Sequence, residues 1–214
     1  MLPLYDENPT KHFPLVTLSF LGANIYIFVM EVSAPQGAAA FIAQYAMIPA
    51  LVLREPLAQY PSIFSSMFMH AGWGHLAGNM LYLWIFGNNI EDVLRKFRFI
   101  LFYFTCGAIA ALCHVLSDLG STIPMVGASG AVSGILGAYL VLFPRARVKT
   151  LIFLGFFITV VSLPAVVLLG VWILIQVASG LLSEGPAGVA WMAHIGGFFA
   201  GMILILPFKA LGRS

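Results

Sequence analysis

The chain contains 214 residues, of which 61% are hydrophobic and 8% are charged, and its mean hydropathy is +0.99. Soluble domains carry about 25% charged residues, so this composition excludes an ordinary soluble domain and indicates a polytopic membrane protein. The formal net charge of +2 gives no sign of a polyanionic partner, and no nucleic acid is expected to bind.

Apolar runs along the chain predict an all-α fold, a polytopic membrane helix bundle with six transmembrane helices. The polar start, Met1 to Lys11, has no signal-peptide pattern, so the first run is expected to remain as a span. The whole chain, residues 1–214, is expected to form a single membrane domain. The predicted spans cover approximately residues 13–30, 67–87, 99–116, 126–143, 165–182 and 189–206.

Two further apolar segments are too short or too interrupted to cross a bilayer. The connection from Gln36 to Ser66 contains three prolines, and within it Ala38 to Met47 is expected to form a short interfacial helix. The segment from Leu151 to Leu163 would reach only about 21 Å as a helix, against a hydrocarbon core of about 30 Å. We therefore expect this segment to be interfacial or re-entrant.

The basic residues support six spans. With this topology and a cytoplasmic N-terminus, nine of the ten bases fall on the inner side and only Arg54 lies outside, as the positive-inside rule requires. A seventh crossing would move Lys209 and Arg213 to the outer side. The plain six-span layout suggests a prokaryotic plasma membrane with both chain ends in the cytoplasm, and an organelle membrane is the alternative.

Strongly polar side chains within spans are costly and are functional candidates by default. Six spans place the starts of the second, fourth and sixth spans on the same outer side of the membrane. Four candidates therefore fall at similar depth, namely His75, Asn79, Ser129 and His194. The other polar residues in spans are expected to be packing or interfacial residues, namely His114, Ser133 and Gln176.

The run of small residues from Gly127 to Gly137 has two interpretations. Small residues four apart let membrane helices pack closely, and a serine is often part of such an interface. Alternatively, Ser129 is a nucleophile at a helix N-terminus, where free N–H groups stabilise developing negative charge.

The sixth span supplies a matching surface. Ala193, Gly197 and Gly201 recur every four residues, and they are expected to pack on the small face of Gly130, Gly134 and Ala138. Such packing would bring His194 within reach of Ser129, the arrangement needed for acyl transfer. The alternative is a structural histidine bonded to a backbone carbonyl. No metal site is expected, because no Asp, Glu or Cys lies near these positions.

His75 and Asn79 are four residues apart and share one helix face. Both side chains can donate hydrogen bonds, and with the N–H of Ser129 they could bind an oxyanion. The alternative is a polar pair that holds the second span against its neighbours.

These motifs resemble the rhomboid family of intramembrane serine proteases. The resemblance covers most of Phe64 to Leu206, so residues 1–214 are expected to be a single rhomboid-like membrane domain of the basic six-span form. The motifs are Gly127-Ala128-Ser129-Gly130, Ala193-His194-Ile195-Gly196-Gly197 and His70-x4-His75-x3-Asn79.

The resemblance implies a serine endopeptidase that cleaves single-span membrane proteins in or near their transmembrane helix. Ser129 would be the nucleophile and His194 its general base, a dyad with no Asp. The oxyanion hole would combine His75, Asn79 and the Ser129 N–H. Gly127 and Ala128 would bind substrate. No cofactor is implied, and the partners are transmembrane substrates and the lipid bilayer, with the oligomeric state left open.

Two positions depart from the family pattern. Some members carry a Trp-Arg pair in the first outer loop, where this chain has Gln59-Tyr60-Pro61-Ser62, with Arg54-Glu55 upstream. Some place a Tyr four residues after the nucleophile, stacked on the catalytic His, where this chain has Ser133.

Two rival functions are considered. A non-catalytic rhomboid relative would bind membrane helices, but such proteins usually lack the Ser or the His, and this chain has both. A small transporter or channel would line a pathway with His and Asn. The sequence has no internal repeat and no intramembrane acid for ion coupling, which disfavours a transporter.

Overall fold

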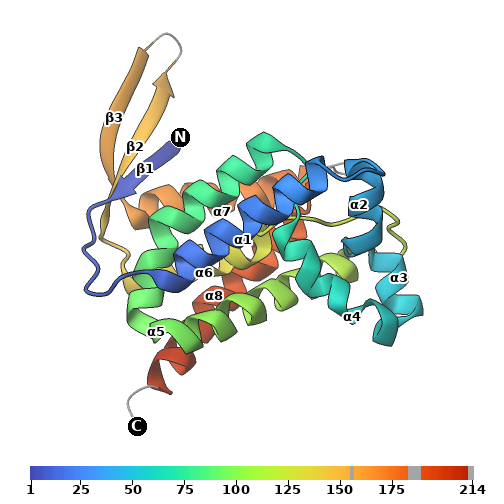
Figure 1. The fold of residues 1–214 in the computed structure, drawn as a ribbon. Helices are drawn as coiled ribbons and strands as arrows, with labels where there is room; N and C mark the ends of the chain where they lie inside the picture. The colour runs from blue at the N-terminus through green and yellow to red at the C-terminus, as the bar shows by residue number, and fades with distance from the viewer. Residues whose placement is uncertain (155–156, 183–188, 212–214) are drawn as a thin grey trace.

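The computed structural model describes residues 1–154, 157–182 and 189–211, and it is a helical bundle with a small sheet at one end (Figure 1). The helices are α1 (Leu15–Val32), α2 (Ala38–Tyr45), α3 (Pro49–Arg54), α4 (Pro56–Ser65), α5 (Trp73–Ser117), α6 (Ser129–Leu142), α7 (Ala165–Leu182) and α8 (Trp191–Ala210), with a 3-10 turn at Ser66–Phe68. The strands are β1 (Leu2–Asp6), β2 (Arg147–Leu154) and β3 (Phe157–Pro164).

The predicted polytopic helical bundle is confirmed. Within the described residues, α1, α5, α7 and α8 are long and apolar enough to cross a membrane, while α6 is a shorter apolar helix. Helix α5 has 45 residues and contains one non-helical residue, Arg95, with φ 64° and ψ 163°. This break lies in the polar connection between the predicted second and third spans, so α5 consists of two helical halves.

The sheet corrects the all-α prediction. The segment expected to be interfacial or re-entrant, Leu151 to Leu163, consists of strands in its described residues: β2 and β3 pair antiparallel, with Arg147 opposite Pro164. β1 pairs antiparallel with β2, which gives the strand order β1-β2-β3. β-Branched and aromatic residues dominate this segment and favour strands. Val148 and Thr150 alternate with more exposed neighbours, as expected for a half-buried strand.

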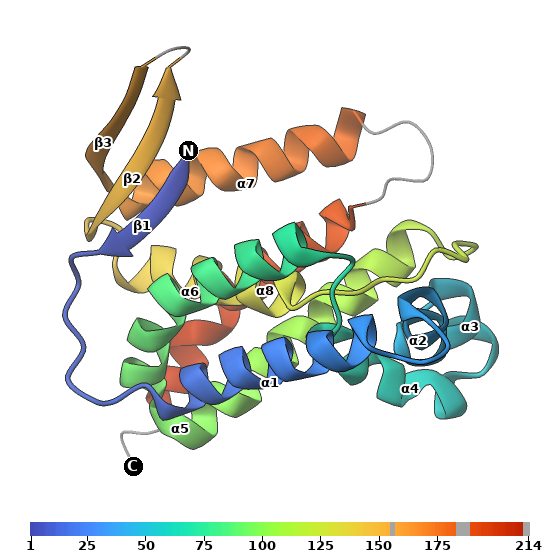
Figure 2. The same ribbon diagram turned by 45° about the horizontal axis from the view of Figure 1, so that its top comes forward.

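Helix α6 is the central helix of the bundle and packs against both α5 and α8 (Figure 2). Every residue from Gly130 to Tyr139 is buried. The first residues of the predicted span 126–143, Val126, Gly127 and Ala128, precede the helix, which begins at Ser129. At 14 residues, α6 is roughly 21 Å long.

The predicted small-residue contact between α6 and α8 is confirmed. A Cβ atom on Gly197 would overlap the carbonyl oxygen of Gly130, and one on Gly201 would overlap the carbonyl oxygen of Gly134. A Cβ atom on Gly130 would in turn come near Ala193. The two backbones are therefore in direct contact, and side chains on adjacent turns of α6 and α8 are close together.

The connection from Gln36 to Ser66 contains α2, α3 and α4, at the opposite end of the molecule from the sheet (Figure 2). The predicted short helix is present as α2. This connection also holds the loop before α6: Met125 N–H donates to the carbonyl oxygen of Met47 at 2.7 Å, and Gly127 N–H donates to that of Ser66 at 2.9 Å. These bonds satisfy backbone groups that are buried before Ser129.

Candidate active site

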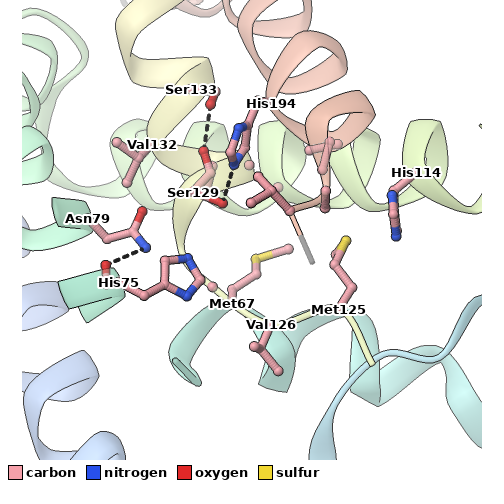
Figure 3. A pocket seen from close by; sticks show the side chains of 18 of the residues that line it. Met67, His75, Asn79, His114, Met125, Val126, Ser129, Val132, Ser133 and His194 are labelled. Carbon is pink, nitrogen blue, oxygen red and sulfur yellow. Dashed lines mark hydrogen bonds between the residues drawn. The ribbon is translucent and has the colours of Figure 1, made fainter. Parts of the chain in front are cut away.

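Two predicted site residues are in hydrogen-bond contact. Ser129 is the first residue of α6, and its Oγ lies 2.8 Å from Nε2 of His194, in the first turn of α8 (Figure 3). The contact follows from the close backbone packing of the two helices. At the start of α6 the first N–H groups have no intrahelical acceptor, so the positive end of the helix dipole lies beside the Ser129 hydroxyl.

The imidazole of His194 has a second polar partner on α7. Its Nδ1 lies 2.7 Å from Oε1 of Gln176. Since a carboxamide oxygen can only accept, Nδ1 carries the proton and Nε2 is free to accept from Ser129. Gln176 is predicted from sequence to be a packing or interfacial residue, and that prediction does not include this contact with His194. The available signal was a polar residue in the middle of an apolar span.

Two aromatic rings lie beside His194, although Ser133 stands where some rhomboid members place a stacking Tyr. The ring centroids of Trp172 and Trp191 each lie 6.1 Å from that of His194, with interplanar angles of 37° and 88°. Neither tryptophan was predicted to be a site residue. The hydroxyl of Ser133 donates to the carbonyl oxygen of Ser129 at 2.6 Å, within α6. The aromatic neighbours of the imidazole therefore come from α7 and α8.

His75 and Asn79 lie on one face of α5, across from Ser129 (Figure 3). The N–H of Ala71 approaches His75 Nδ1 at 3.4 Å, so Nδ1 accepts and Nε2 carries the proton. One amide hydrogen of Asn79 is donated to the carbonyl oxygen of His75 at 3.1 Å, which leaves the second hydrogen unused by that bond. Each side chain thus retains a donor on the side of the cavity.

A cavity of about 550 Å³ connects these groups. Its lining includes all four predicted polar residues together with Gly127 and His114. Ala128, predicted to bind substrate, is 0% exposed and belongs to the hydrophobic core, so its side chain does not face the cavity. Within the described residues, no group of three or more His, Cys, Asp or Glu side chains is arranged to hold a metal ion.

His70 and Glu31 support the start of α5. The backbone N–H of His70 donates to Glu31 Oε2 at 3.1 Å, and both residues are buried. The His70 ring is edge-on to that of His75, with centroids 5.2 Å apart. Glu31 lies one residue beyond the first predicted span and was not among the predicted site residues.

Comparison with known proteins identifies the family. The family described as "Rhomboid domain" matches residues 57–210, which include both members of the Ser129–His194 pair. The chain belongs to the rhomboid family. The predicted resemblance is thereby confirmed, and the protein is a polytopic rhomboid membrane protein.

Curated rhomboid relatives are similar over most of this chain. "Rhomboid protein 1, mitochondrial" of Saccharomyces cerevisiae is 30% identical over 66% of this chain and 40% of its own length. "Rhomboid protease GluP" of Bacillus subtilis is 33% identical over 68% of this chain and 26% of its own length. "Rhomboid-like protein 11, chloroplastic" of Arabidopsis thaliana is 27% identical over 74% of this chain and 56% of its own length. The chain therefore spans about a quarter to a half of the length of these relatives.

These relatives correct the expected location. Two of the three are named for mitochondria or chloroplasts. The rhomboid match supports a membrane protein, but the prediction of a prokaryotic plasma membrane, with both chain ends in the cytoplasm, is wrong on this finding.

Proposed function

We propose that this rhomboid is an intramembrane serine endopeptidase that cleaves single-span membrane proteins in or near their transmembrane helix. The observation that carries the proposal is the 2.8 Å contact between Ser129 Oγ and His194 Nε2 at the wall of a cavity. A hydroxyl paired with a neutral imidazole acceptor is the minimum needed for nucleophilic acyl transfer. A non-catalytic role as a membrane-helix binder gains no support from this pairing.

The reaction follows from the positions of these groups. Ser129 Oγ attacks the peptide carbonyl carbon while His194 Nε2 takes the hydroxyl proton. The carbonyl oxygen becomes an oxyanion, which the Ser129 N–H, the His75 Nε2–H and the free Asn79 amide hydrogen stabilise. His194 then protonates the leaving amine, and the C–N bond breaks. Water, deprotonated by His194, hydrolyses the acyl-enzyme and regenerates Ser129.

The length of α6 supports a site below the membrane surface. We propose that six apolar helices cross the membrane, with the halves of α5 on either side of Arg95 counted separately and α6 as the central span. Helix α6 is roughly 21 Å long, less than the hydrocarbon core of about 30 Å. The loop before Ser129 must therefore cross the remaining thickness of the hydrocarbon core. Irregular backbone is tolerated there because it is buried in protein and borders a cavity.

The substrate must expose a peptide carbonyl to Ser129. An intact helix keeps its carbonyls in intrahelical hydrogen bonds, so the substrate helix has to unwind locally near the cleaved bond. Gly127 lines the cavity and is the proposed contact for the substrate backbone, whereas Ala128 contributes only main-chain atoms. Residues 1–214 are proposed to act as one domain within the bilayer, with no cofactor.

Cleavage in a reconstituted membrane tests the proposal. The purified protein in liposomes is incubated with a single-span substrate, and products are identified by mass spectrometry. We expect cleavage by the wild type and none by Ser129→Ala. Ser19→Ala, which removes an exposed serine on α1, is the matched control and should cleave normally. Equal cleavage by the Ser129→Ala protein would refute the proposal.

Loss of one oxyanion donor should slow the reaction without abolishing it. Removal of such a donor typically lowers kcat by about 100- to 1000-fold. His75→Ala and Asn79→Ala proteins should therefore retain slow cleavage that still depends on Ser129. Unchanged rates in both variants would remove these side chains from the oxyanion hole and leave the Ser129–His194 pair in place.

A further inference from the structure

The carboxamide of Gln176 lies behind the imidazole of His194, on the side away from Ser129. It projects from α7, is 7% exposed, and its Oε1 is 2.7 Å from His194 Nδ1. This is the length of a well-formed hydrogen bond. His194 is consequently bonded at both ring nitrogens, to α6 through Ser129 and to α7 through Gln176.

The orientation of the carboxamide is set by its own helix. Gln176 Nε2 lies 3.5 Å from the carbonyl oxygen of Trp172, one turn earlier on α7. In the opposite orientation Oε1 would face this carbonyl oxygen, and two acceptors would meet without a proton between them. The NH2 group of the carboxamide therefore points toward the Trp172 carbonyl oxygen, and the carboxamide oxygen points toward His194.

The acceptor determines where the imidazole carries its proton. A neutral imidazole has one protonated and one free nitrogen, and the partner of one nitrogen fixes the state of the other. With Oε1 of Gln176 at Nδ1, the proton stays on Nδ1 and the lone pair of Nε2 faces the Ser129 hydroxyl. In the other tautomer Nε2 would present a proton to Ser129 and could not act as a base.

We propose that Gln176 is a positioning residue for His194, so that the site is a Ser–His–Gln arrangement rather than an unsupported dyad. This inference rests on the proposed protease function. Gln176 selects the tautomer and holds the ring, while bond making and breaking remain with Ser129 and His194.

An uncharged acceptor suits this position. The described lining of the cavity contains no Asp or Glu, and a buried carboxylate here would have no cationic partner. Burial of an unpaired charge is costly, especially within a membrane. A carboxamide supplies the accepting oxygen without that cost. It gives up the added stabilisation that a carboxylate provides to the imidazolium formed during the reaction.

Labelling kinetics test the inference. A fluorophosphonate reacts only with an activated serine, so its rate at Ser129 measures the competence of the base. We expect Gln176→Leu to lower this rate about 10- to 100-fold, as for loss of a buried hydrogen bond. The control is Ile175→Ala on the same helix, whose side chain is 53% exposed, and it should label at the wild-type rate.

A second variant separates the accepting oxygen from packing. Gln176→Glu keeps an acceptor at the same distance, so labelling should recover relative to Gln176→Leu. The added carboxylate should also move the acid limit of labelling to higher pH. Among the described residues, the other titratable groups that act on His194 are His75 and His114, both on α5, and these are unchanged in the variant. A Gln176→Glu protein as slow as Gln176→Leu, with the wild-type pH profile, would overturn the inference.

The wild type alone supplies an independent measurement should a variant fail to fold. Nitrogen-15 NMR distinguishes the two imidazole tautomers, and the His194 signals are those lost in the His194→Ala protein. We expect the proton on Nδ1 in the wild type. A proton on Nε2, or Gln176→Leu labelling at the wild-type rate, would refute the role of Gln176 while the protease proposal stands. Absence of labelling in the wild type would instead refute the proposed function.

Discussion

The imidazole of His75 occupies the space that a side chain on Gly127 would need. A Cβ atom at position 127 would lie 2.8 Å from Cε1 and 2.9 Å from Nε2 of His75, closer than real Cβ contacts allow. Gly127 also has a φ of 126°, a conformation that disfavours any residue with a side chain. The loop before Ser129 and the proposed oxyanion donor can therefore approach each other only with glycine at this position.

Gly127→Ala should reduce activity more than stability. The methyl group would displace His75 and strain the loop, so we expect a fall in kcat of about 100-fold or more, similar to loss of one oxyanion donor. Gly120→Ala is the matched control, because it lies in the same loop and its Cβ would meet only Asp118 Oδ1, at an ordinary contact distance of 3.9 Å. Cleavage kinetics measure the effect, and equal rates for the two variants would contradict the proposed contact.

Gly201→Ala should separate α6 from α8. The new methyl group would meet the backbone of Gly134, which cannot rotate away as a side chain can. Overpacking of this kind typically costs about 1–3 kcal/mol. Thermal unfolding in detergent should show a lower midpoint, with reduced labelling of Ser129. Gly170→Ala on α7 is the control, since nothing lies within 4 Å of its Cβ position, and its midpoint should be unchanged or slightly higher.

Glu91 holds the first turn of α1 and should contribute to stability. Its Oε1 accepts from the N–H of Val16 at 2.9 Å, and its Oε2 accepts from the N–H of Thr17 at 2.7 Å. Glu91→Ala would leave buried donors without an acceptor, at a cost of about 1–3 kcal/mol. Glu91→Gln keeps one acceptor oxygen and should cost less. Unfolding measurements that rank the two variants equally would argue against this capping role.

Asp6 should make stability depend on pH. Burial raises the pKa of this carboxyl above its ordinary value of 3.8, although hydrogen bonds from Tyr139 and Asn89 oppose the increase. The folded protein therefore holds the proton more tightly than the unfolded chain does. Stability from this group is fully present below pH 3.8 and is lost as pH rises through the raised pKa.

Asp6→Asn should flatten this dependence. The amide oxygen can still accept from Tyr139, whose hydroxyl is 2.7 Å from Asp6 Oδ2, and no charge has to be buried. Unfolding free energies measured between about pH 4 and 7 should decline less in the variant than in the wild type. Asp118→Asn, at an exposed loop position, should retain the wild-type slope. Identical slopes for all three proteins would contradict the account.

Local sequence patterns predicted how Ser129 and His194 would meet. Small residues at intervals of four on two predicted spans favour a close backbone approach, and the predicted order of the spans put both residues at similar depth. These two patterns were enough to predict the contact without knowing how the loops fold.

The remainder depended on long-range contacts. Leu151 to Leu163 is apolar without a clear period, so its own pattern did not distinguish strand from helix, and the pairing of β2 with the distant β1 could not be read from it. The role of Gln176 depends on the rotation of α7 relative to α8, which an almost uniformly apolar helix does not encode in its own pattern. The aromatic neighbours of His194, Trp172 and Trp191, were not predicted because they lie on α7 and α8, whereas an aromatic residue was expected at position 133 on α6.

The most direct test of the central claim is mass-spectrometric mapping of a fluorophosphonate adduct on the purified, membrane-reconstituted protein. We predict an adduct on Ser129 in the wild type, and loss of that adduct in both the Ser129→Ala and His194→Ala proteins. An absence of adduct on Ser129, or an adduct that forms equally fast without His194, would contradict it.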